Sequence, residues 1–477
     1  MIQIHNTLTG KLQDFEPAQP GLVRMYVCGV TPYDVCHLGH GRCYVVFDVI
    51  RRVLRDNGYK VRFIQNFTDV DDKIIMRAHE KGITTTELVK ANIEDYFNKM
   101  DALGVERADA YPRVTENIPD IIALIRKIMD KKAAYRLGGD VYFSVRQDPD
   151  YGKLSKRPLD ELQSGARIDV NKEKKDPLDF ALWKEAKPNE PPEAAWDSPW
   201  SRGRPGWHIE CSVMSLKHLG SDFDIHGGGL DLIFPHHENE IAQSETATGA
   251  PFVRFWMHNG FVTLNREKMS KSAGNFFTLS EIFAKYHPSV VRYMLLSVHY
   301  RSPLDFSPDL LDQSRQSLAK LKDAVARATF VMRKQGGAVD SSGKTDSDVA
   351  LAARTILNDF REALANDFNT PGALAEVHRL VGLLEKQFLS NTIQAQDIRM
   401  LLSHLRTMAE VLGLDLFPRT GDVLIPSAVS ELAREREAAR QQKNWKEADR
   451  LRQAILEQGY VVEDTASGPR LLPKAGS

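Results

Sequence analysis

The chain has 477 residues, enough for two to four domains with a large buried core. Its formal net charge of -1 excludes nucleic-acid binding through a general positive field, so an RNA partner would need local basic patches. Four cysteines make no disulfide framework, and we find neither a secretory segment nor an apolar run of about 20 residues, so a cytoplasmic protein outside the membrane is expected.

The first half of a nucleotide-binding fold is expected from about residue 25 to residue 116, after a short strand pair in residues 1–20. An apolar strand over residues 22–27 leads to a helix whose apolar positions recur between Cys43 and Leu54. A second strand follows at residues 60–67, after which Thr68 or Asp69 is expected to cap the next helix, with Asp71 and Asp72 also suited to capping. This succession of strand, loop, helix and strand predicts two parallel strands joined by a right-handed crossover.

The turn between the first strand and its helix contains His37, Gly39 and His40. Ligands bind at the carboxyl edge of an open parallel sheet, and free N–H groups at a helix start favour phosphate. The turn is therefore a candidate phosphate site, although a glycine flanked by surface histidines at a helix start is common.

The second half of the fold is expected after an insertion at residues 118–203, which interrupts the alternation of strands and helices. A turn at Arg204 precedes a helix that ends at Leu219. A strand is expected to end at His226, and the following Gly227, Gly228 and Gly229 would let a ligand approach the backbone, or would simply form a tight turn. Asp231 could accept a hydrogen bond from a ribose hydroxyl.

Two lysines follow a predicted strand at residues 255–264. Lys268 and Lys271 stand in a loop of small residues, where their ammonium groups could meet phosphate oxygens as point charges. A solvated loop is the alternative interpretation.

A metal site is a further possibility at the same sheet edge. His236 and Glu240 are four residues apart in an expected helix and so share one face, while Cys28 and Cys211 stand near the same edge. Two thiolates, an imidazole and a carboxylate would make a four-ligand zinc set. Isolated cysteines are more often small buried residues, and His237 and Glu238 compete as ligands by spacing alone.

The C-terminal third is expected to be helical. Helices at residues 310–334, 348–365, 371–390 and 398–412 would form an antiparallel bundle. A charged helical region at residues 431–457, broken at Asn444 and Trp445, precedes a short strand at residues 460–465.

The two motifs at His37 to His40 and residues 268–272 together resemble the paired motifs of class I aminoacyl-tRNA synthetases. With Cys28, residues 207–211, 226–229 and 235–240, the chain resembles the cysteinyl-tRNA synthetase family over nearly its whole length. The resemblance implies an α/β fold with a Rossmann-like doubly wound parallel sheet, an inserted subdomain, a helical bundle and a small anticodon-binding module. The expected domains are residues 1–117 and 204–306 for the two catalytic halves, 118–203 for the insertion, 307–420 for the bundle and 421–477 for the C-terminal module.

The resemblance also implies roles for individual residues. One zinc ion per subunit is expected on Cys28, Cys211, His236 and Glu240. Catalytic roles fall to His37, His40, Lys268 and Lys271, and ATP, used with Mg²⁺, is expected near Gly39, Gly227, Gly228, Asp231 and Lys271. Substrate contacts are expected from Thr68, Trp207 and His226, although Trp207 could equally be a core residue. Anticodon contacts are expected from Arg440, Trp445, Asp449, Arg452 and Asp464, for which a solvated charged helix is the alternative.

The implied reaction is attack of the L-cysteine carboxylate on the α-phosphorus of ATP, followed by transfer of cysteine to the 3′ end of tRNA(Cys). It needs positioning and charge neutralisation, and no side-chain nucleophile is expected. Zinc would distinguish a thiol from the serine hydroxyl without an editing domain. We expect a monomer. The alternatives are a cysteine-adenylating ligase with a small-molecule amine acceptor, a small-molecule nucleotidyltransferase and a catalytically silent RNA-binding paralogue.

Overall fold

The computed structural model describes residues 1–157, 173–188, 190–264, 267–268, 277–334, 347–389, 395–417, 427–465 and 468–474. The chain forms two compact units. One comprises residues 1–314, 361–374 and 411–414, and the other comprises residues 315–360, 375–410 and 415–477. Over the described ranges, no helix combines the length and the apolar character needed to cross a lipid bilayer.

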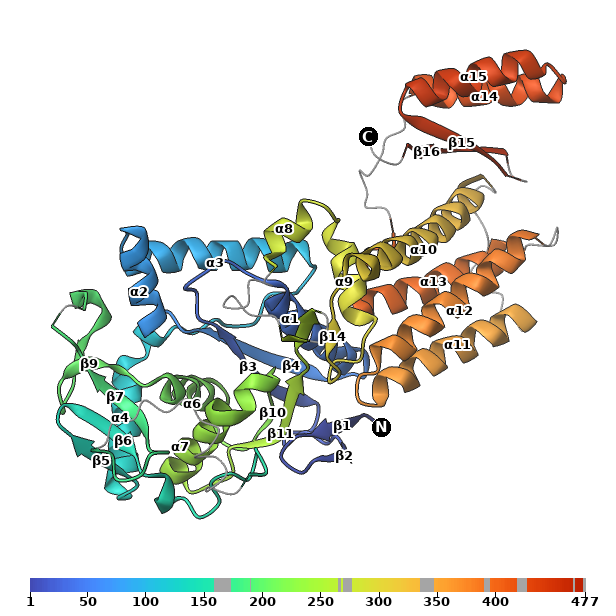
Figure 1. Cartoon of the computed structure of the whole chain (residues 1–477). Coiled ribbons are helices and arrows are strands. Elements are labelled where there is room, and N and C mark those ends of the chain that lie inside the picture. The colour runs from blue at the N-terminus through green and yellow to red at the C-terminus, as the bar shows by residue number, and fades with distance from the viewer. Residues whose placement is uncertain are drawn as a thin grey trace. The chain divides into compact units, whose positions relative to one another are not determined.

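A four-stranded parallel sheet in the order β11, β10, β3, β4 lies at the centre of the first unit (Figure 1). Four consecutive residues of β3, from Met25 to Cys28, are buried, as expected for a central strand covered on both faces. Helices α1 and α6 both pack against the sheet. The predicted fold class is confirmed. The elements are β3 (Leu22–Val30), α1 (Leu38–Asp56), β4 (Lys60–Phe67), α6 (Trp207–Leu219), β10 (Phe223–Gly229), α7 (Glu238–Thr248) and β11 (Val253–Asn259).

The predicted end of β10 is wrong. The strand does not stop at His226 but includes all three glycines, and Gly227, Gly228 and Gly229 pair with β11. Glycine is required at Gly227 because an added Cβ would lie 2.2 Å from the ring of Phe47 on α1. Gly227 therefore serves close packing between the sheet and α1, which periodicity could not reveal.

Two other predicted elements also need correction. The single strand expected at residues 255–264 is divided at Gly260 into β11 and β12 (Val262–Leu264), which belong to different sheets. The division lets β12 pair with β13 (Glu267–Lys268) and β14 (Leu304–Asp305) in a three-stranded sheet. Arg204 lies in strand β9 and not in a turn.

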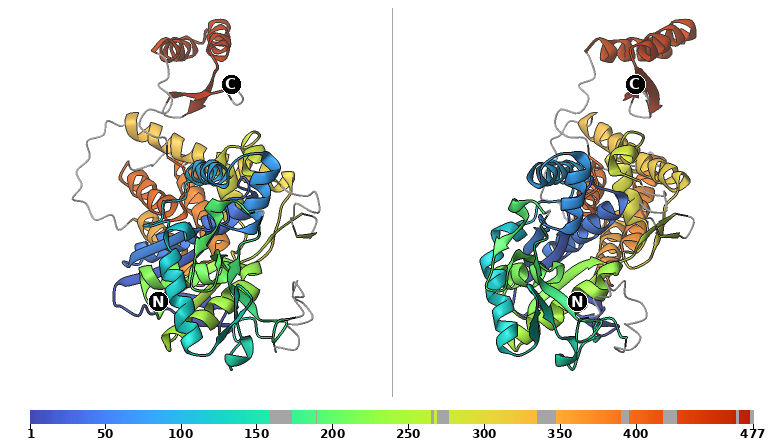
Figure 2. Two further views of the ribbon diagram at one scale, coloured as in Figure 1. Left: turned by 90° about the vertical axis from the view of Figure 1, so that its left-hand side faces the viewer. Right: turned by 60° about the vertical axis from the view of Figure 1, so that its left-hand side comes forward.

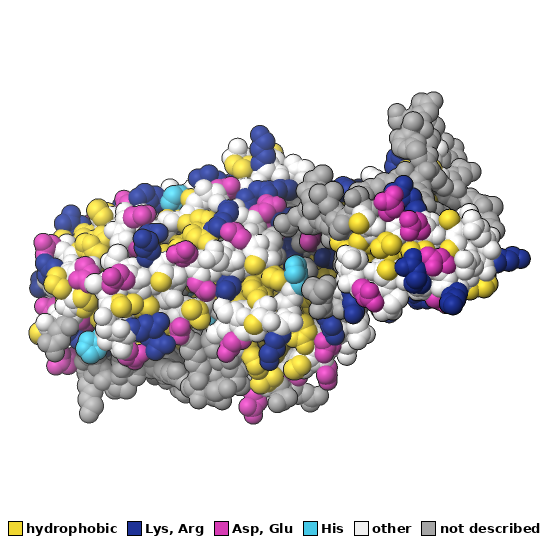
Figure 3. Space-filling model, turned by 90° about the horizontal axis from the view of Figure 1, so that it is seen from above, with side chains coloured by type: hydrophobic (Ala, Val, Ile, Leu, Met, Phe, Trp, Pro, Cys, Tyr) yellow, Lys and Arg dark blue, Asp and Glu magenta, His cyan; other side chains and the backbone are white. Residues whose placement is uncertain are grey.

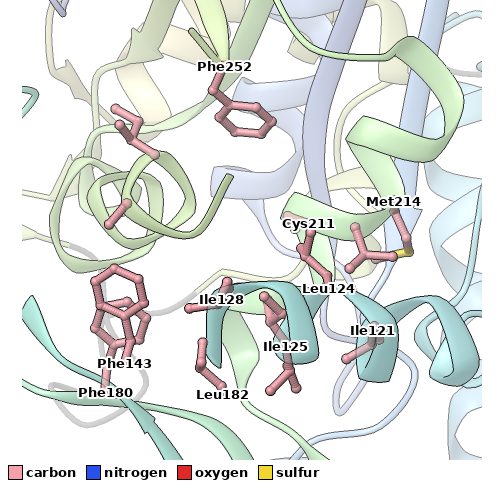
Figure 4. Packing of buried hydrophobic residues seen from close by; sticks show 14 of the residues in the cluster. Ile121, Leu124, Ile125, Ile128, Phe143, Phe180, Leu182, Cys211, Met214 and Phe252 are labelled. Atoms are coloured by element: carbon pink, nitrogen blue, oxygen red, sulfur yellow. The ribbon is translucent and has the colours of Figure 1, made fainter. Parts of the chain in front are cut away.

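The insertion is an antiparallel sheet in the order β5, β6, β7, β9, β8, next to helix α4. Figure 4 shows apolar side chains of α4, including Ile125 and Ile128, between the insertion strands and α6. The insertion therefore shares one hydrophobic core with the second half of the catalytic fold. Its elements are α4 (Ile118–Asp130), β5 (Ala134–Leu137), β6 (Asp140–Phe143), β7 (Phe180–Glu185), β8 (Trp196–Asp197) and β9 (Arg202–Pro205).

Asp71 is the N-cap of helix α2, and its side chain accepts a hydrogen bond from the backbone N–H of Lys73. Thr68 and Asp69 do not cap this helix, because Asp69 instead accepts hydrogen bonds from the backbone and hydroxyl of Thr115. The remaining elements of this unit are β1 (Gln3–Asn6) and β2 (Lys11–Asp14), which form the predicted strand pair, α2 (Asp72–Lys81), α3 (Thr85–Ala102), α8 (Leu279–Phe283) and α9 (Pro288–Leu296).

The C-terminal third is helical at the predicted positions. Buried apolar residues recur every three or four positions, as in Leu318, Leu321 and Val325 of α10. The C-terminal module consists of a helix pair and a strand pair that share a small core around Val429, Ile455 and Val462 (Figure 2). The bounds are α10 (Pro308–Lys334), α11 (Asp348–Ala365), α12 (Thr370–Leu389), α13 (Ala395–Leu412), α14 (Ser427–Gln441), α15 (Trp445–Glu457), β15 (Tyr460–Thr465) and β16 (Gly468–Pro473).

The contact between Gly227 and Phe47 predicts the effect of a methyl group at this position. Gly227→Ala should lower the free energy of unfolding by about 1–3 kcal/mol, because the buried strand leaves no room for the added atom. Urea denaturation followed by circular dichroism measures the change. Phe47→Leu removes ring atoms, so the double variant should lose less than the sum of the two single losses. Strictly additive losses would show that the two residues do not share this space.

Candidate metal centre and nucleotide turn

The histidine turn lies where it was predicted, between β3 and the start of α1. His37 is the N-cap of α1, and its backbone N–H donates to Nδ1 of His40 at 3.4 Å. The two imidazole rings are stacked, with centroids 3.6 Å apart. An added Cβ at Gly39 would lie 2.9 Å from the His37 ring, so glycine is needed here for the stacked arrangement itself.

Four potential metal ligands converge at the carboxyl edge of the sheet. Sγ of Cys28 lies 3.7 Å from Sγ of Cys211 and 3.5 Å from Oε1 of Glu240. Nε2 of His236 lies 3.0 Å from the same Glu240 oxygen. Ligand atoms around a tetrahedral zinc ion with bonds of about 2.0–2.3 Å are separated by about 3.3–3.8 Å. All four residues are buried and their ligand atoms lie within 4.8 Å of one another, so the donor set suits zinc.

The charges in this cluster also suit a cation. Burial raises the pKa of Glu240, but His226 and His236 outweigh burial and lower it to about 2. Burial lowers the pKa of His236, whereas Glu240 and Cys211 raise it to about 10. The hydrogen bond from Cys28 lowers the pKa of Cys211 to about 6, while burial, together with Cys211, raises that of Cys28. These pKa directions favour a carboxylate on Glu240, a thiolate on Cys211 and a proton on His236, and a zinc ion would displace that proton to bind the imidazole.

A layer of histidines surrounds these four residues. His226 is fully buried and its Nε2 lies 2.8 Å from Oε2 of Glu240, so it orients the carboxylate. His237 Nδ1 lies 2.8 Å from Nε2 of His258, whose Nδ1 lies 2.8 Å from the Thr7 hydroxyl. Sequence analysis missed His258 and Thr7, because nothing in their local pattern links residues 251 positions apart.

The two competing ligands behave differently. Glu238 accepts hydrogen bonds from the backbone N–H groups of Leu154 and Ser155, and thereby holds the insertion instead of facing the cluster. His237 remains a competitor, because its Nε2 lies 3.3 Å from Sγ of Cys28. Cys28, His226, His237 and Glu240 form a second group with metal-ligand spacing. Only the first group contains both cysteines, which a zinc ion favours.

A cavity of about 250 Å³ adjoins the cluster. Trp207 lines it and is 38% exposed, so Trp207 is no core residue. Its ring lies 4.3 Å from that of His236, and His208 Nδ1 lies 3.0 Å from Nδ1 of His236. The other lining residues are Thr31, Asp71, Lys73, Ala181 and Lys184. The cavity offers an aromatic wall, a carboxylate and two ammonium groups beside the candidate metal ligands.

Other predicted site residues lie at the same sheet edge. Thr68 is buried at the end of β4, where its hydroxyl accepts a hydrogen bond from the Asn66 side chain. Asn66 also accepts from the backbone N–H of Gly29, next to Cys28. Gly227 and Gly228 lie inside β10, and Asp231 follows in a short 3₁₀ turn. The Asp231 carboxylate would lie 2.5 Å from a Cβ added at Gly229. The backbone of Lys268 lies in β13, and Lys271 lies outside the described residues.

The predicted anticodon residues gather on the C-terminal module. Trp445, Asp449 and Arg452 occupy positions i, i+4 and i+7 of α15 and share one exposed face, with Trp445 59% exposed. Asp464 on β15 pairs with Arg436, at 2.6 and 3.0 Å, and with Arg440. Acidic and basic side chains are interspersed over the face shown in Figure 3, in keeping with the near-zero net charge. Local contacts, not a general field, must therefore hold RNA.

The distinct contacts of Glu238 and Glu240 predict opposite outcomes for two matched variants. Glu240→Gln should remove the bound metal, because it replaces an anionic ligand atom at the centre of the cluster. Glu238→Gln should keep the metal, because that side chain faces the backbone of Leu154 and Ser155. Atomic emission spectrometry of the purified variants measures the metal content. The ligand assignment is wrong if Glu238→Gln loses the metal while Glu240→Gln retains it.

Comparisons with known proteins identify the family of the chain. Residues 14–316 match the family described as tRNA synthetases class I (C) catalytic domain, residues 359–417 match a DALR domain, and residues 422–468 match a cysteinyl-tRNA ligase anticodon binding domain. A cysteine–tRNA ligase of Endomicrobium trichonymphae is 48% identical over 99% of both chains, and that of Caldicellulosiruptor saccharolyticus is 46% identical over 98% of this chain and 99% of its own. The solved methionyl-tRNA synthetase of Mycobacterium tuberculosis, in complex with methionyl-adenylate, shares the fold with a TM-score of 0.60 and 19% identity over 82% of this chain and 89% of its own. The chain belongs to the cysteine–tRNA ligase family of class I aminoacyl-tRNA synthetases.

Proposed function

We propose that this chain activates L-cysteine with ATP and transfers the cysteinyl group to the 3′ end of tRNA(Cys). In the first step a carboxylate oxygen of cysteine bonds to the α-phosphorus of ATP, and pyrophosphate leaves. In the second step a ribose hydroxyl of the terminal adenosine attacks the cysteinyl carbonyl, and AMP leaves. The observation that carries the proposal is the buried cluster of Cys28, Cys211, His236 and Glu240 beside the Trp207 cavity, close to the histidine turn.

The cluster supplies the selectivity that this substrate demands. Serine and cysteine have nearly the same shape, and an apolar cavity separates such pairs by only about 1–3 kcal/mol. A zinc ion held by these four residues would bind the substrate thiol as a thiolate, which a serine hydroxyl imitates poorly. Glu240 is held in place by His226, so the ligand set is already oriented before a substrate arrives.

The remaining active-site residues position substrates and neutralise charge. The stacked rings of His37 and His40 stand at the start of α1, where imidazole N–H groups and the helix dipole can stabilise the α-phosphoryl oxygens. Lys268 and Lys271 supply ammonium groups for the phosphates that leave as pyrophosphate. The Mg²⁺ ion that accompanies ATP brings further positive charge to the same phosphates. Trp207 forms the wall of the cysteine cavity, and Gly39, Gly227, Gly228 and Asp231 contribute to the ATP site. No side-chain nucleophile is required.

The C-terminal module favours tRNA over a small-molecule acceptor. An exposed tryptophan next to an aspartate and an arginine on one helix face offers stacking and hydrogen bonding to unpaired bases. A ligase that transfers cysteine to a small amine would not need this module. We therefore assign Arg440, Trp445, Asp449, Arg452 and Asp464 to anticodon recognition.

The zinc assignment predicts the behaviour of Cys211→Ser. This variant should lose stoichiometric zinc and most of its preference for cysteine over serine, because it removes one thiolate ligand. Pyrophosphate exchange with each amino acid, together with metal analysis, measures both effects. Cys43→Ser provides the control, because Cys43 belongs to neither metal-ligand group. The proposal fails if Cys211→Ser keeps its zinc and its full selectivity.

The anticodon assignment predicts a defect confined to tRNA. Trp445→Ala should lower kcat/KM for tRNA by roughly tenfold, because one stacked base contributes about 1–3 kcal/mol, and should leave cysteine activation unchanged. Arg450→Ala is the control, since Arg450 lies on another face of α15 and pairs with Glu447. Altering the anticodon should lower the kcat/KM of the Trp445→Ala variant for tRNA less than it lowers the kcat/KM of the unaltered chain. The assignment is wrong if neither the variant nor the anticodon changes alter kcat/KM.

A further inference from the structure

Arg42 follows the histidine turn directly and is completely buried in the first turns of α1. Its guanidinium donates to five backbone carbonyl groups and, among the described residues, forms no ion pair. The acceptors are Leu295 at 2.8 Å, Val298 at 3.5 Å, His299 at 2.8 Å, Tyr300 at 3.4 Å and Ser302 at 3.0 Å. Burial lowers the pKa of Arg42 to about 10, which leaves it charged at neutral pH. The Nε of Arg42 has no hydrogen-bond partner among the described residues, so carbonyl oxygens on the two terminal nitrogens hold this cation and fix the course of the backbone that supplies them.

The segment that Arg42 holds is joined directly to the strand leading to Lys268. Gly260 donates its N–H to the carbonyl of Tyr300 at 2.7 Å, and Leu304 donates to Phe261 at 2.9 Å. Strand β14 then pairs with β12. Strand β12 in turn pairs with β13, and Thr263 of β12 lies opposite Lys268 of β13. An unbroken series of hydrogen bonds therefore connects α1 with the backbone of Lys268.

A second connection meets the same turn from the other side. Leu38 donates its N–H to the carbonyl of Phe277 at 3.2 Å, and Leu279 donates to Cys36 at 3.0 Å. His37 also forms an isolated bridge with Thr278. The backbone on both sides of residues 269–276 is thus tied to the start of α1.

We propose that Arg42 is a positioning residue that sets the strand carrying Lys268 at a fixed distance from His37 and His40. This inference rests on the proposed function, in which both motifs contact ATP. Arg42 lies one turn inside α1, is fully buried and does not line the cavity beside Trp207. It acts through the backbone of residues 295–302 and so controls the geometry of ATP activation without contacting ATP.

On its opposite side, the same segment is hydrogen-bonded to a buried carboxylate. Tyr300 donates its hydroxyl to Asp367 at 2.7 Å, and Arg301 donates to the same carboxylate at 2.6 Å. Residues 295–302 are therefore hydrogen-bonded to Arg42 on one side and to Asp367 on the other. The hydrogen bonds to Asp367 remain when Arg42 is changed, so the segment should shift without unfolding.

The test compares two arginines with the same burial. Arg42→Lys keeps the charge, but a compact ammonium with three donors cannot span five carbonyl groups. Arg292→Lys is the matched control, because Arg292 is also buried and binds Asp48 on α1 and the carbonyls of Leu103 and Leu412, but none of residues 297–306. Zinc content, melting temperature, cysteine-dependent pyrophosphate exchange and transfer from preformed cysteinyl-adenylate to tRNA are measured for both.

Arg42→Lys should lower pyrophosphate exchange by about 100-fold, the loss expected from a misplacement near 1 Å. Zinc content, KM for cysteine and transfer from preformed adenylate should stay within about threefold of the unaltered chain, because those steps do not use the triphosphate. Arg292→Lys should lower the melting temperature without this selective loss. Gly260→Ala is a second variant that leaves Arg42 intact. Its Cβ would lie 2.4 Å from the Ser302 carbonyl oxygen and should produce the same selective defect.

The proposal is overturned if exchange and adenylate transfer fall in equal proportion in both Arg42→Lys and Gly260→Ala, or if Arg292→Lys reproduces the defect. Should Arg42→Lys not fold, Gly260→Ala decides alone. His40→Ala, measured alongside, separates this inference from the proposed function. Full exchange in His40→Ala would refute the role of the histidine turn, whereas loss in His40→Ala with normal exchange in Arg42→Lys would refute only the role of Arg42.

Discussion

The buried carboxylate of Glu240 is the constraint on which the candidate metal centre depends. An ionised carboxylate without access to water costs several kcal/mol unless charged or hydrogen-bonding partners surround it. Glu240 meets this demand through His226 on β10 and through His236, two residues before α7, at 2.8 and 3.0 Å. The position of one side chain therefore fixes the register between a strand and the following helix. The two cysteines come to the same place because β3, which carries Cys28, ends there and α6, which carries Cys211, begins there.

The residues around Glu240 combine three tasks in one turn of the chain. His236 faces the candidate metal, His237 reaches His258 on β11, and Glu238 holds the backbone of the insertion. The insertion is therefore anchored two residues away from the candidate ligands His236 and Glu240 and shares its core with α6, which carries Cys211. A change in the insertion near Leu154 can reach the metal ligands through Glu238 without touching them.

Local patterns in the sequence predicted the fold class, most helices and the candidate ligands, because these depend on periodicity and on residues close together in the chain. The helix after His37 and the strand over residues 60–67 are examples. The packing of Phe47 against Gly227 and the carbonyl cluster around Arg42 were not predictable, since each joins segments 180 or more residues apart. For the same reason it stayed open from the sequence whether the glycine run approaches a ligand or forms a tight turn. Only the family resemblance could choose His236 over His237, because both have suitable spacing.

The central position of β3 has a consequence for biosynthesis. Met25 pairs on one side with Phe63 and on the other with Ile225, which is 200 residues further along the chain. During translation the apolar strand therefore acquires its first neighbour early and keeps an unpaired edge until β10 leaves the ribosome. Such an edge attracts other strands, and contacts between distant residues form slowly. The nascent chain should need protection by chaperones most in the interval between the synthesis of β4 and of β10.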